Sequence, residues 1–489
     1  MLFAQPKFHV AIASPEIAPF AKTGGLGDVL SALPKALARL GVRVSLFMPA
    51  YRSALKAGFP LEDTGFRFNV PVSNRSEEAA VFRADAGNGI DVYLIRADRY
   101  FDRENLYGTP EGDYPDNAER FVFFCRAVLE ALRRDPPNIL HCHDWQSALA
   151  IAFLKAQPQA YQELSSARTV FTFHNAGYQG LFSPLDWGLL NLASSFFTPS
   201  YLEFYGNINF LKGALVFADA LTTVSPTYAQ EVQTPEEGFG LEGVFQEQAA
   251  KLSGILNGAD YEVWNPETDL FIAKPYGSHT MRGKALCKAD LRRTLGLRRE
   301  AGIPLMGMVT RLAGQKGLDL LENGLGQLME RDVQLVILGA GDREYQDYFQ
   351  DALGRHPGRA AIRVAFNETL AHKIVAGADM LLMPSQYEPC GLTQMYSLKY
   401  GTIPIVRATG GLKDTVQEFD PKRSTGTGFL FGPYDEHALL EAVDRALALF
   451  RRRPQWSRIM KNAMLAEFSW DQSARKHLEL YESLLNKQR

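Results

Sequence analysis

The chain has 489 residues, of which 46% are hydrophobic and 22% charged, and its formal net charge is −3. This length exceeds what one hydrophobic core usually supports, so we expect two large domains, and the composition excludes a disordered or fibrous protein. The small negative charge gives no general basic surface for nucleic acid, and no run of about 18 apolar residues predicts a membrane span.

The cysteines and the first residues bear on the cellular compartment. Cys125, Cys142, Cys287 and Cys390 are scattered, form no CxxC pair and are too few to cross-link a chain of this length. The opening segment, "MLFAQPKFHVAIAS", lacks the basic stretch and long apolar run of a secretory signal. We therefore expect a soluble cytoplasmic protein with reduced thiols.

In the first half of the chain, short apolar runs rich in β-formers alternate with longer helical patterns. The strands expected here are 8–14, 42–51, 138–144, 167–175 and 220–226. Amphipathic helices are expected at 29–41 and 117–134. This alternation of strands and helices is typical of a parallel sheet covered by helices.

The second half repeats the pattern. Its expected strands are 304–312, 333–342, 361–368, 378–385 and 402–409, each followed by a helical stretch. The sequence thus predicts an α/β protein with two doubly wound, Rossmann-like domains that meet near 251–260, and a closing amphipathic helix at 469–485. Ligands bind beyond the carboxyl ends of strands in such sheets, so we expect the active site in a cleft between the domains.

Residues 20–30, "FAKTGGLGDVL", place three glycines just before a helix. The stretch lacks the third glycine of a dinucleotide fingerprint, and Lys22 precedes the glycines instead of following them as in a P-loop. Bare backbone at a helix start, beside an ammonium group, suits a phosphate. The alternative is a flexible turn between strand and helix.

Two stretches of the second half also indicate phosphate binding. In "RLAGQKGLDLL" (311–321), Arg311 and Lys316 could both reach a diphosphate, although a solvated basic loop is an equal alternative. In 384–406, a turn after a strand presents Glu388 toward a sugar or ribose and places a phosphate seat at a helix start. Here the alternatives are a carboxylate that interacts with the helix dipole and, for Cys390, a small packed residue.

Polar residues also end two strands of the first half. His174 and Asn175 follow the strand at 167–175, where a ligand should lie, although a lone histidine is more often structural. His141 and His143 resemble metal ligands, but they share one face of a strand while Cys142 points to the other, and no ligand-rich partner motif follows. We therefore expect no metal site here, and Asp144-Trp145 either orients the cleft or starts the next helix.

These motifs occur in the order found in a known family. The matching segments are 22–29, 143–146, 174–180, 257–260, 311–319, 339–342, 388–416 and 468–474. Over almost its full length the chain resembles the bacterial glycogen synthases and plant starch synthases, retaining glucosyltransferases of family 5 with the GT-B architecture. The resemblance implies transfer of glucose from ADP-glucose to the non-reducing end of a glycogen or malto-oligosaccharide chain, without a metal or other cofactor.

The resemblance implies functional roles for the residues of this sequence that match the family's motifs. Catalytic roles are implied for His174, Arg311, Lys316, Glu388, Asp28 and Asn257. Donor binding is implied for Lys22, Gly24, Gly25, Phe366, Cys390, Gly391, Leu392 and Thr393. We expect an N-terminal domain at 1–252, a donor-binding domain at 253–468, and a C-terminal helix at 469–489 that returns to the N-terminal domain.

Two other functions compete with this one. The same fold could use UDP-glucose or glucosylate a small acceptor, because no side chain identified above distinguishes adenine from uracil. A catalytically silent glucan-binding protein would be expected to have lost Lys22, Arg311, Lys316 or Glu388, and all four are present. A Rossmann dehydrogenase is disfavoured by the missing third glycine. We expect neither nucleic acid nor a membrane among the partners.

Overall fold

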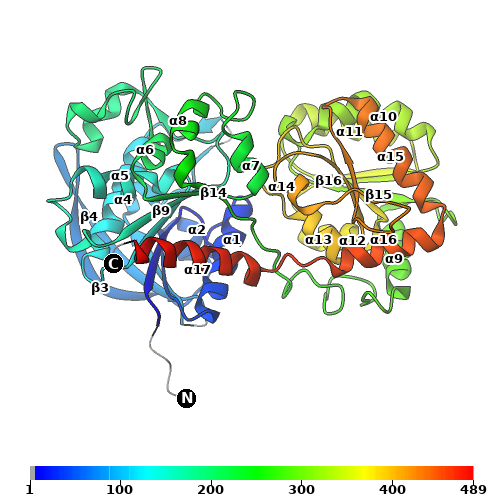
Figure 1. Ribbon diagram of the computed structural model, residues 1–489, viewed down its shortest axis with the longest axis horizontal. Coiled ribbons are helices and arrows are strands. Elements are labelled where there is room, and N and C mark those ends of the chain that lie inside the picture. Colours follow the sequence, from blue (N-terminus) through cyan, green and yellow to red (C-terminus); the bar gives the residue numbers. More distant parts are fainter. Residues whose placement is uncertain (1–5, 88, 110, 488–489) are drawn as a thin grey trace, which may run out of the picture. The chain divides into compact units, whose positions relative to one another are not determined.

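The computed structural model describes residues 6–87, 89–109 and 111–487, and its elements are drawn in Figure 1. The chain forms two compact units. One runs up to Gly258 and resumes at Trp470, and the other is Ala259–Ser469. In the part of the chain that the structure describes, no helix is long and apolar enough to cross a membrane.

The first unit is built on a nine-stranded sheet with the order β14-β13-β9-β8-β1-β2-β5-β4-β3. Its strands are β1 (His9–Ala13), β2 (Arg43–Pro49), β3 (Glu62–Val72), β4 (Arg75–Asp85), β5 (Asp91–Arg96), β8 (Ile139–His143), β9 (Arg168–Phe173), β13 (Ala220–Thr223) and β14 (Leu252–Gly254). All neighbours pair in parallel except β3 with β4 and β4 with β5, which are antiparallel. The five strands predicted in this half are confirmed, and the β3–β4 hairpin was not predicted.

Helices cover this sheet, and short strands form two further small sheets. The helices are α1 (Gly25–Arg39), α2 (Arg52–Lys56), α3 (Asp98–Phe101), α4 (Asn117–Leu132), α5 (Trp145–Ala156), α6 (Phe210–Phe217), α7 (Pro226–Glu231), α8 (Glu242–Glu247) and α17 (Trp470–Asn486). The short strands are β6 (Gly108–Thr109), β7 (Gly112–Asp113), β10 (Leu181–Phe182), β11 (Glu203–Phe204) and β12 (Asn207–Asn209). The closing helix α17 packs along α1, as Figure 1 shows.

The second unit has a six-stranded, fully parallel sheet with the order β17-β16-β15-β18-β19-β20. Its strands are β15 (Leu305–Val309), β16 (Gln334–Gly339), β17 (Ala360–Val364), β18 (Met380–Met383), β19 (Ile403–Arg407) and β20 (Phe429–Phe431). Its helices are α9 (Arg282–Leu295), α10 (Leu318–Glu330), α11 (Arg343–Gly354), α12 (Glu368–Gly377), α13 (Thr393–Lys399), α14 (Gly410–Thr415), α15 (Glu436–Phe450) and α16 (Arg453–Leu465). The predicted doubly wound fold is thus confirmed in both units.

Each sheet reverses its winding direction beside its first strand. In the first unit β1 lies between β2 and β8, and in the second unit β15 lies between β16 and β18. Crossover connections leave such a point in opposite directions, so a crevice opens at the carboxyl ends of the two central strands, where ligands of open α/β sheets bind. The loops after β1, β8, β15 and β18 are therefore placed to carry a site.

Helix α17 is tied to the core of the first unit by a buried hydrogen bond. The Tyr481 hydroxyl lies 2.7 Å from Nδ1 of His141, and neither residue is exposed to solvent. Burial raises the pKa of Tyr481 far above its ordinary value, so the hydroxyl keeps its proton. This bond connects the last helix of the chain to the central strand β8.

Removing that hydroxyl should destabilise the first unit. We expect Tyr481→Phe to lower its free energy of unfolding by about 1–3 kcal/mol, because a buried ring nitrogen loses its partner. Urea unfolding followed by circular dichroism measures the change. Tyr205→Phe is the matched control, since Tyr205 is 80% exposed; equal midpoints for the two variants would contradict the prediction.

Candidate functional site

The glycine loop after β1 is held by a buried carboxylate. Helix α1 begins at Gly25, and Gly24 is its extended N-cap residue. The Glu16 carboxylate accepts hydrogen bonds from the Thr23 N–H (2.6 Å), the Thr23 hydroxyl (2.5 Å) and the Gly24 N–H (3.3 Å). The Tyr107 hydroxyl donates to the same carboxylate at 2.8 Å, and Glu16 is only 4% exposed. The first amides of the loop therefore already have an anionic acceptor within the protein.

Four residues predicted for the site lie together in this loop: Lys22, Gly24, Gly25 and Asp28. Lys22 Nζ and Asp28 Oδ1 are 2.7 Å apart, and both side chains are more than one third exposed. An ion pair this accessible is weak, so the lysine ammonium can reorient toward a ligand at small cost. Glu16 was not predicted, because a single carboxylate after a strand belongs to no recognisable motif.

The neighbouring strand ends converge on His174. Asp144 follows β8 directly, with φ 58° and ψ 171°, a combination that residues other than glycine rarely adopt. Its Oδ1 accepts the His174 N–H at 2.7 Å, while Nδ1 of His143 lies 3.1 Å from Nε2 of His174. Helix α5 begins at Trp145, so Asp144 both precedes that helix, as predicted, and holds the end of β9.

The histidines of this region are neutral. Burial lowers the pKa of His174 to about 3, and it lowers the pKa values of His141 and His143 well below the ordinary value. The rings of His141 and His143 lie on one face of β8 with their centroids 4.2 Å apart, as the strand alternation predicts. No group of three or more potential metal-binding side chains occurs among the residues that the structure describes.

Burial acts in the opposite direction on Asp144. It raises the pKa of this carboxyl to about 7, because the charged form loses hydration; the His174 N–H opposes the rise and the nearby Glu16 carboxylate adds to it. Asn257, another predicted site residue, is buried and lies in this unit, just before its last residue ahead of the second unit, Gly258.

In the second unit an ion pair joins the loops that follow β15 and β18. Lys316 Nζ lies 2.7 Å from Glu388 Oε2, and these side chains are 20% and 9% exposed. The Ser385 hydroxyl donates to the same carboxylate oxygen at 3.1 Å. Gly317 has φ 69°, and a Cβ there would lie 2.0 Å from the carbonyl oxygen of Pro384, so only glycine lets the two loops approach this closely.

The turn that carries Glu388 leads directly into α13. Leu392 is the N-cap residue of this helix and Thr393 is its first residue, so the predicted helix start is confirmed. Gly391 has a positive φ, and Cys390 is buried. The Gly411 N–H donates to the Glu388 carbonyl at 3.0 Å, which fixes the backbone beneath the carboxylate.

Two further predicted residues of this unit lie at the carboxyl ends of its strands. Arg311 follows β15 on the loop that carries Lys316. Phe366 follows β17 and is 90% exposed, so its ring is available for stacking on a ligand. The structure thus brings Lys316 and Glu388 into contact and leaves Phe366 on a separate loop of the same sheet.

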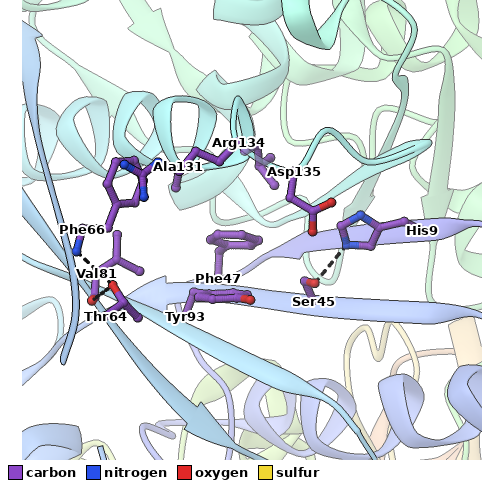
Figure 2. A pocket seen from close by; sticks show the side chains of 11 residues that line it. His9, Ser45, Phe47, Thr64, Phe66, Val81, Tyr93, Ala131, Arg134 and Asp135 are labelled. Atoms are coloured by element: carbon purple, nitrogen blue, oxygen red, sulfur yellow. Dashed lines mark hydrogen bonds between the residues drawn. The ribbon is translucent and has the colours of Figure 1, made fainter. Parts of the chain in front are cut away.

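The cavity in Figure 2 lies within the first unit, away from the loops that follow the carboxyl ends of β1 and β8. It is lined by His9, the first residue of β1, by Ser45 of β2 and by Asp135 after α4, and the rings of Phe47 and Tyr93 stack within it 5.0 Å apart. His9 and Ser45 belong to the amino-terminal halves of their strands, whereas the loops with candidate residues follow the carboxyl ends. None of the predicted site residues lines this cavity.

Comparisons with known proteins give a consistent result. A family model described as the starch synthase catalytic domain matches residues 9–247, and one described as glycosyl transferases group 1 matches residues 297–463. The chain is 47% identical to a glycogen synthase of Koribacter versatilis over 97% of this chain and 98% of that protein. It is 45% identical to a glycogen synthase of Syntrophotalea carbinolica over 97% and 98%.

Two solved structures resemble the chain. The catalytic domain of starch synthase IV from Arabidopsis thaliana, bound to ADP and acarbose, matches with a TM-score of 0.89 and 34% identity over 98% of this chain and 99% of that one. A sucrose-phosphate synthase from Thermosynechococcus elongatus matches with a TM-score of 0.62 and 18% identity over 98% and 100%, a likeness of fold alone.

The raised pKa of Asp144 predicts a pH dependence of stability. The folded-state pKa of about 7 exceeds the ordinary value of 3.8, so the folded chain binds this proton more tightly than the unfolded chain. The contribution of Asp144 to the free energy of unfolding is therefore fully present below about pH 4 and is lost as the pH rises through 7. Asp144→Asn should remove it. Urea unfolding at pH 5 and pH 8 should show a larger loss in the wild type than in D144N, and equal losses would refute the assignment.

The role of Glu16 can be tested through the mobility of the glycine loop. Glu16→Gln removes a charged acceptor shared by Thr23 and Gly24, and hydrogen bonds to charged groups contribute about 1.5–3 kcal/mol. Amide hydrogen exchange in residues 22–25 should therefore accelerate by about 10- to 100-fold, as measured by mass spectrometry. Glu104→Gln, a change at an exposed position, is the control. Exchange in 22–25 that is equal in both variants would show that Glu16 does not hold the loop.

Proposed function

Because the chain belongs to the family of the bacterial glycogen synthases and plant starch synthases, and is thus a glycosyltransferase of GT-B architecture, we propose that it elongates α-1,4-glucans from ADP-glucose. Glucose passes to the non-reducing end of a glycogen or malto-oligosaccharide chain with retention of configuration, and ADP is released. The ADP and acarbose in the related starch synthase IV structure support this choice of donor and acceptor.

The observation that carries the proposal is the Lys316–Glu388 pair at the reversal point of the second sheet. As the glycosidic bond breaks, negative charge develops on the departing diphosphate, and a fixed cation at this place stabilises it more than the ground state. Lys316 supplies such a cation, and Arg311 on the same loop supplies a second. Glu388 orients Lys316 and accepts hydrogen bonds from the glucosyl hydroxyls.

In this scheme the residues of the first unit contact the sugar. Lys22 and the glycine loop approach the donor, Asp28 and Asn257 shape the glucosyl and acceptor side, and His174 contacts the sugar through its ring or its main-chain carbonyl. In the second unit Gly391, Leu392 and Thr393 contact the distal phosphate, beside Cys390, and Phe366 stacks on the adenine. The leaving phosphate takes the acceptor's proton, so the reaction needs neither a protein base nor a metal.

We also propose a cytoplasmic location. The four cysteines, all within the described residues, are buried and form no disulfide. Structural disulfides are rare in reducing compartments, and this cysteine usage fits such a compartment. Fractionation of the source cells with an antibody against the chain tests the location directly.

The first experiment measures incorporation of labelled glucose into glycogen by the purified protein. ADP-glucose and UDP-glucose are compared side by side in EDTA. Faster transfer from ADP-glucose supports the proposal, and a preference for UDP-glucose retains the reaction but changes the donor. Absence of transfer from both donors, with glycogen still bound in a sedimentation assay, would favour a non-catalytic glucan-binding protein.

Loss of either cation should slow the reaction strongly. We expect Lys316→Ala and Arg311→Ala each to lower kcat/KM for ADP-glucose by about 10²–10³, the scale for removing one preorganised charge-stabilising donor. Lys422→Ala, a change at an exposed lysine of the same unit, should leave the rate unchanged. Decreases below threefold in both site variants would exclude these cations from transition-state stabilisation.

A further inference from the structure

His174 is held at two points by two consecutive residues of the neighbouring strand end. Its N–H donates to Asp144 Oδ1 at 2.7 Å, and its Nε2 lies 3.1 Å from Nδ1 of His143. The backbone contact fixes where the residue lies, and the ring contact fixes how its imidazole is turned. A residue held this way can present one ring nitrogen to a ligand in a defined protonation state.

In the contact between the two rings, one proton lies between Nδ1 of His143 and Nε2 of His174. Burial lowers the pKa values of both histidines well below neutrality, so each ring carries one proton at pH 7. Either His143 donates from Nδ1 and His174 carries its own proton on Nδ1, or His174 donates from Nε2 and His143 carries its proton on Nε2.

The surroundings of His143 distinguish these arrangements. Its Nε2 is buried and has no hydrogen-bond partner among the described residues. A proton there would leave a buried N–H group without an acceptor, and genuinely orphaned buried N–H groups are rare in proteins. The arrangement with the proton on Nδ1 of His143 avoids the orphaned N–H group.

The His143 ring is also held in place. It lies against the His141 ring, with the centroids 4.2 Å apart and the ring planes tilted by 35°. Both nitrogens of His141 are engaged, Nδ1 with the Tyr481 hydroxyl at 2.7 Å and Nε2 with the Thr172 hydroxyl at 2.6 Å. His141 therefore cannot rotate without breaking two buried hydrogen bonds, and its fixed ring restricts the rotation of the adjacent His143 ring.

We propose that His143 is a positioning residue that donates its Nδ1 proton to Nε2 of His174 and thereby fixes His174 as the Nδ1–H tautomer. His174 then offers an N–H donor from Nδ1 and cannot offer one from Nε2. The kinetic consequence rests on the proposed function, in which His174 contacts the glucosyl group: a donor fixed in direction forms its hydrogen bond without reorganisation. The tautomer itself does not depend on the reaction.

The tautomer is measured by long-range ¹H–¹⁵N correlation spectra of the full chain labelled with ¹⁵N-histidine, with His174→Gln used to assign the signal. We expect protonated Nδ1 and unprotonated Nε2 for His174 in the wild type. His143→Asn keeps an N–H donor at the position of Nδ1 and should retain this pattern, whereas His143→Leu should convert His174 wholly or partly to the Nε2–H form. An Nε2–H form in the wild type would overturn the proposal.

Kinetics supply the second readout. We expect H143L to lower kcat by about 10- to 100-fold with KM for ADP-glucose changed less than threefold, and H143N to recover most of the loss. The matched control, His437→Asn, replaces an exposed histidine of the second unit and should not differ from the wild type. Equal losses in H143L and H143N would contradict donation by His143. A wild type inactive with both donors would refute the proposed function and leave the tautomer result standing.

Discussion

The reversal of winding direction beside the first strand of each sheet is the constraint on which the candidate site depends. It leaves the carboxyl ends of β1 and β8, and of β15 and β18, without a crossover connection packed over them. The loops at these ends can therefore carry polar and charged side chains, which would be costly to bury in the interior of the sheet. Glu16, Asp144, Lys316 and Glu388 all lie in such loops.

These loops are ordered by contacts within the protein. Glu16 accepts the N–H groups of Thr23 and Gly24 and so holds the glycine loop in place through contacts within the protein. Asp144 adopts a backbone conformation that costs of order 1–3 kcal/mol for residues other than glycine, and it gains the contact with the His174 N–H. The burial of the Glu16 carboxylate and the strained backbone of Asp144 cost free energy, and the hydrogen bonds that the two carboxylates accept offset part of this cost. These hydrogen bonds hold the neighbouring loops in fixed positions, as a preorganised site requires.

The strands that could be predicted from the sequence are those buried on both faces, because such strands have nearly continuous apolar sequences. Residues 334–339, which are all buried, are an example. It did not predict the hairpin of β3 and β4, because much of β3 is solvent-exposed and its apolar residues form no such run. Lys316 and Glu388 were each predicted, but their contact spans 72 residues and depends on the pairing of β15 with β18. His143 was considered only as a metal ligand, since its partner His174 lies 31 residues away.

The two units contribute different electrostatics to the proposed reaction. In the first unit burial keeps His141, His143 and His174 neutral, so in the proposed scheme these rings offer the sugar directed hydrogen bonds without a positive charge of their own. In the second unit the mostly buried Lys316 is paired with Glu388. In the proposed reaction the diphosphate shares that ammonium with the carboxylate, which also accepts hydrogen bonds from the sugar hydroxyls. A neutral His174 cannot compete with Lys316 for the phosphates, so the developing charge is stabilised at the leaving group, where bond cleavage generates it.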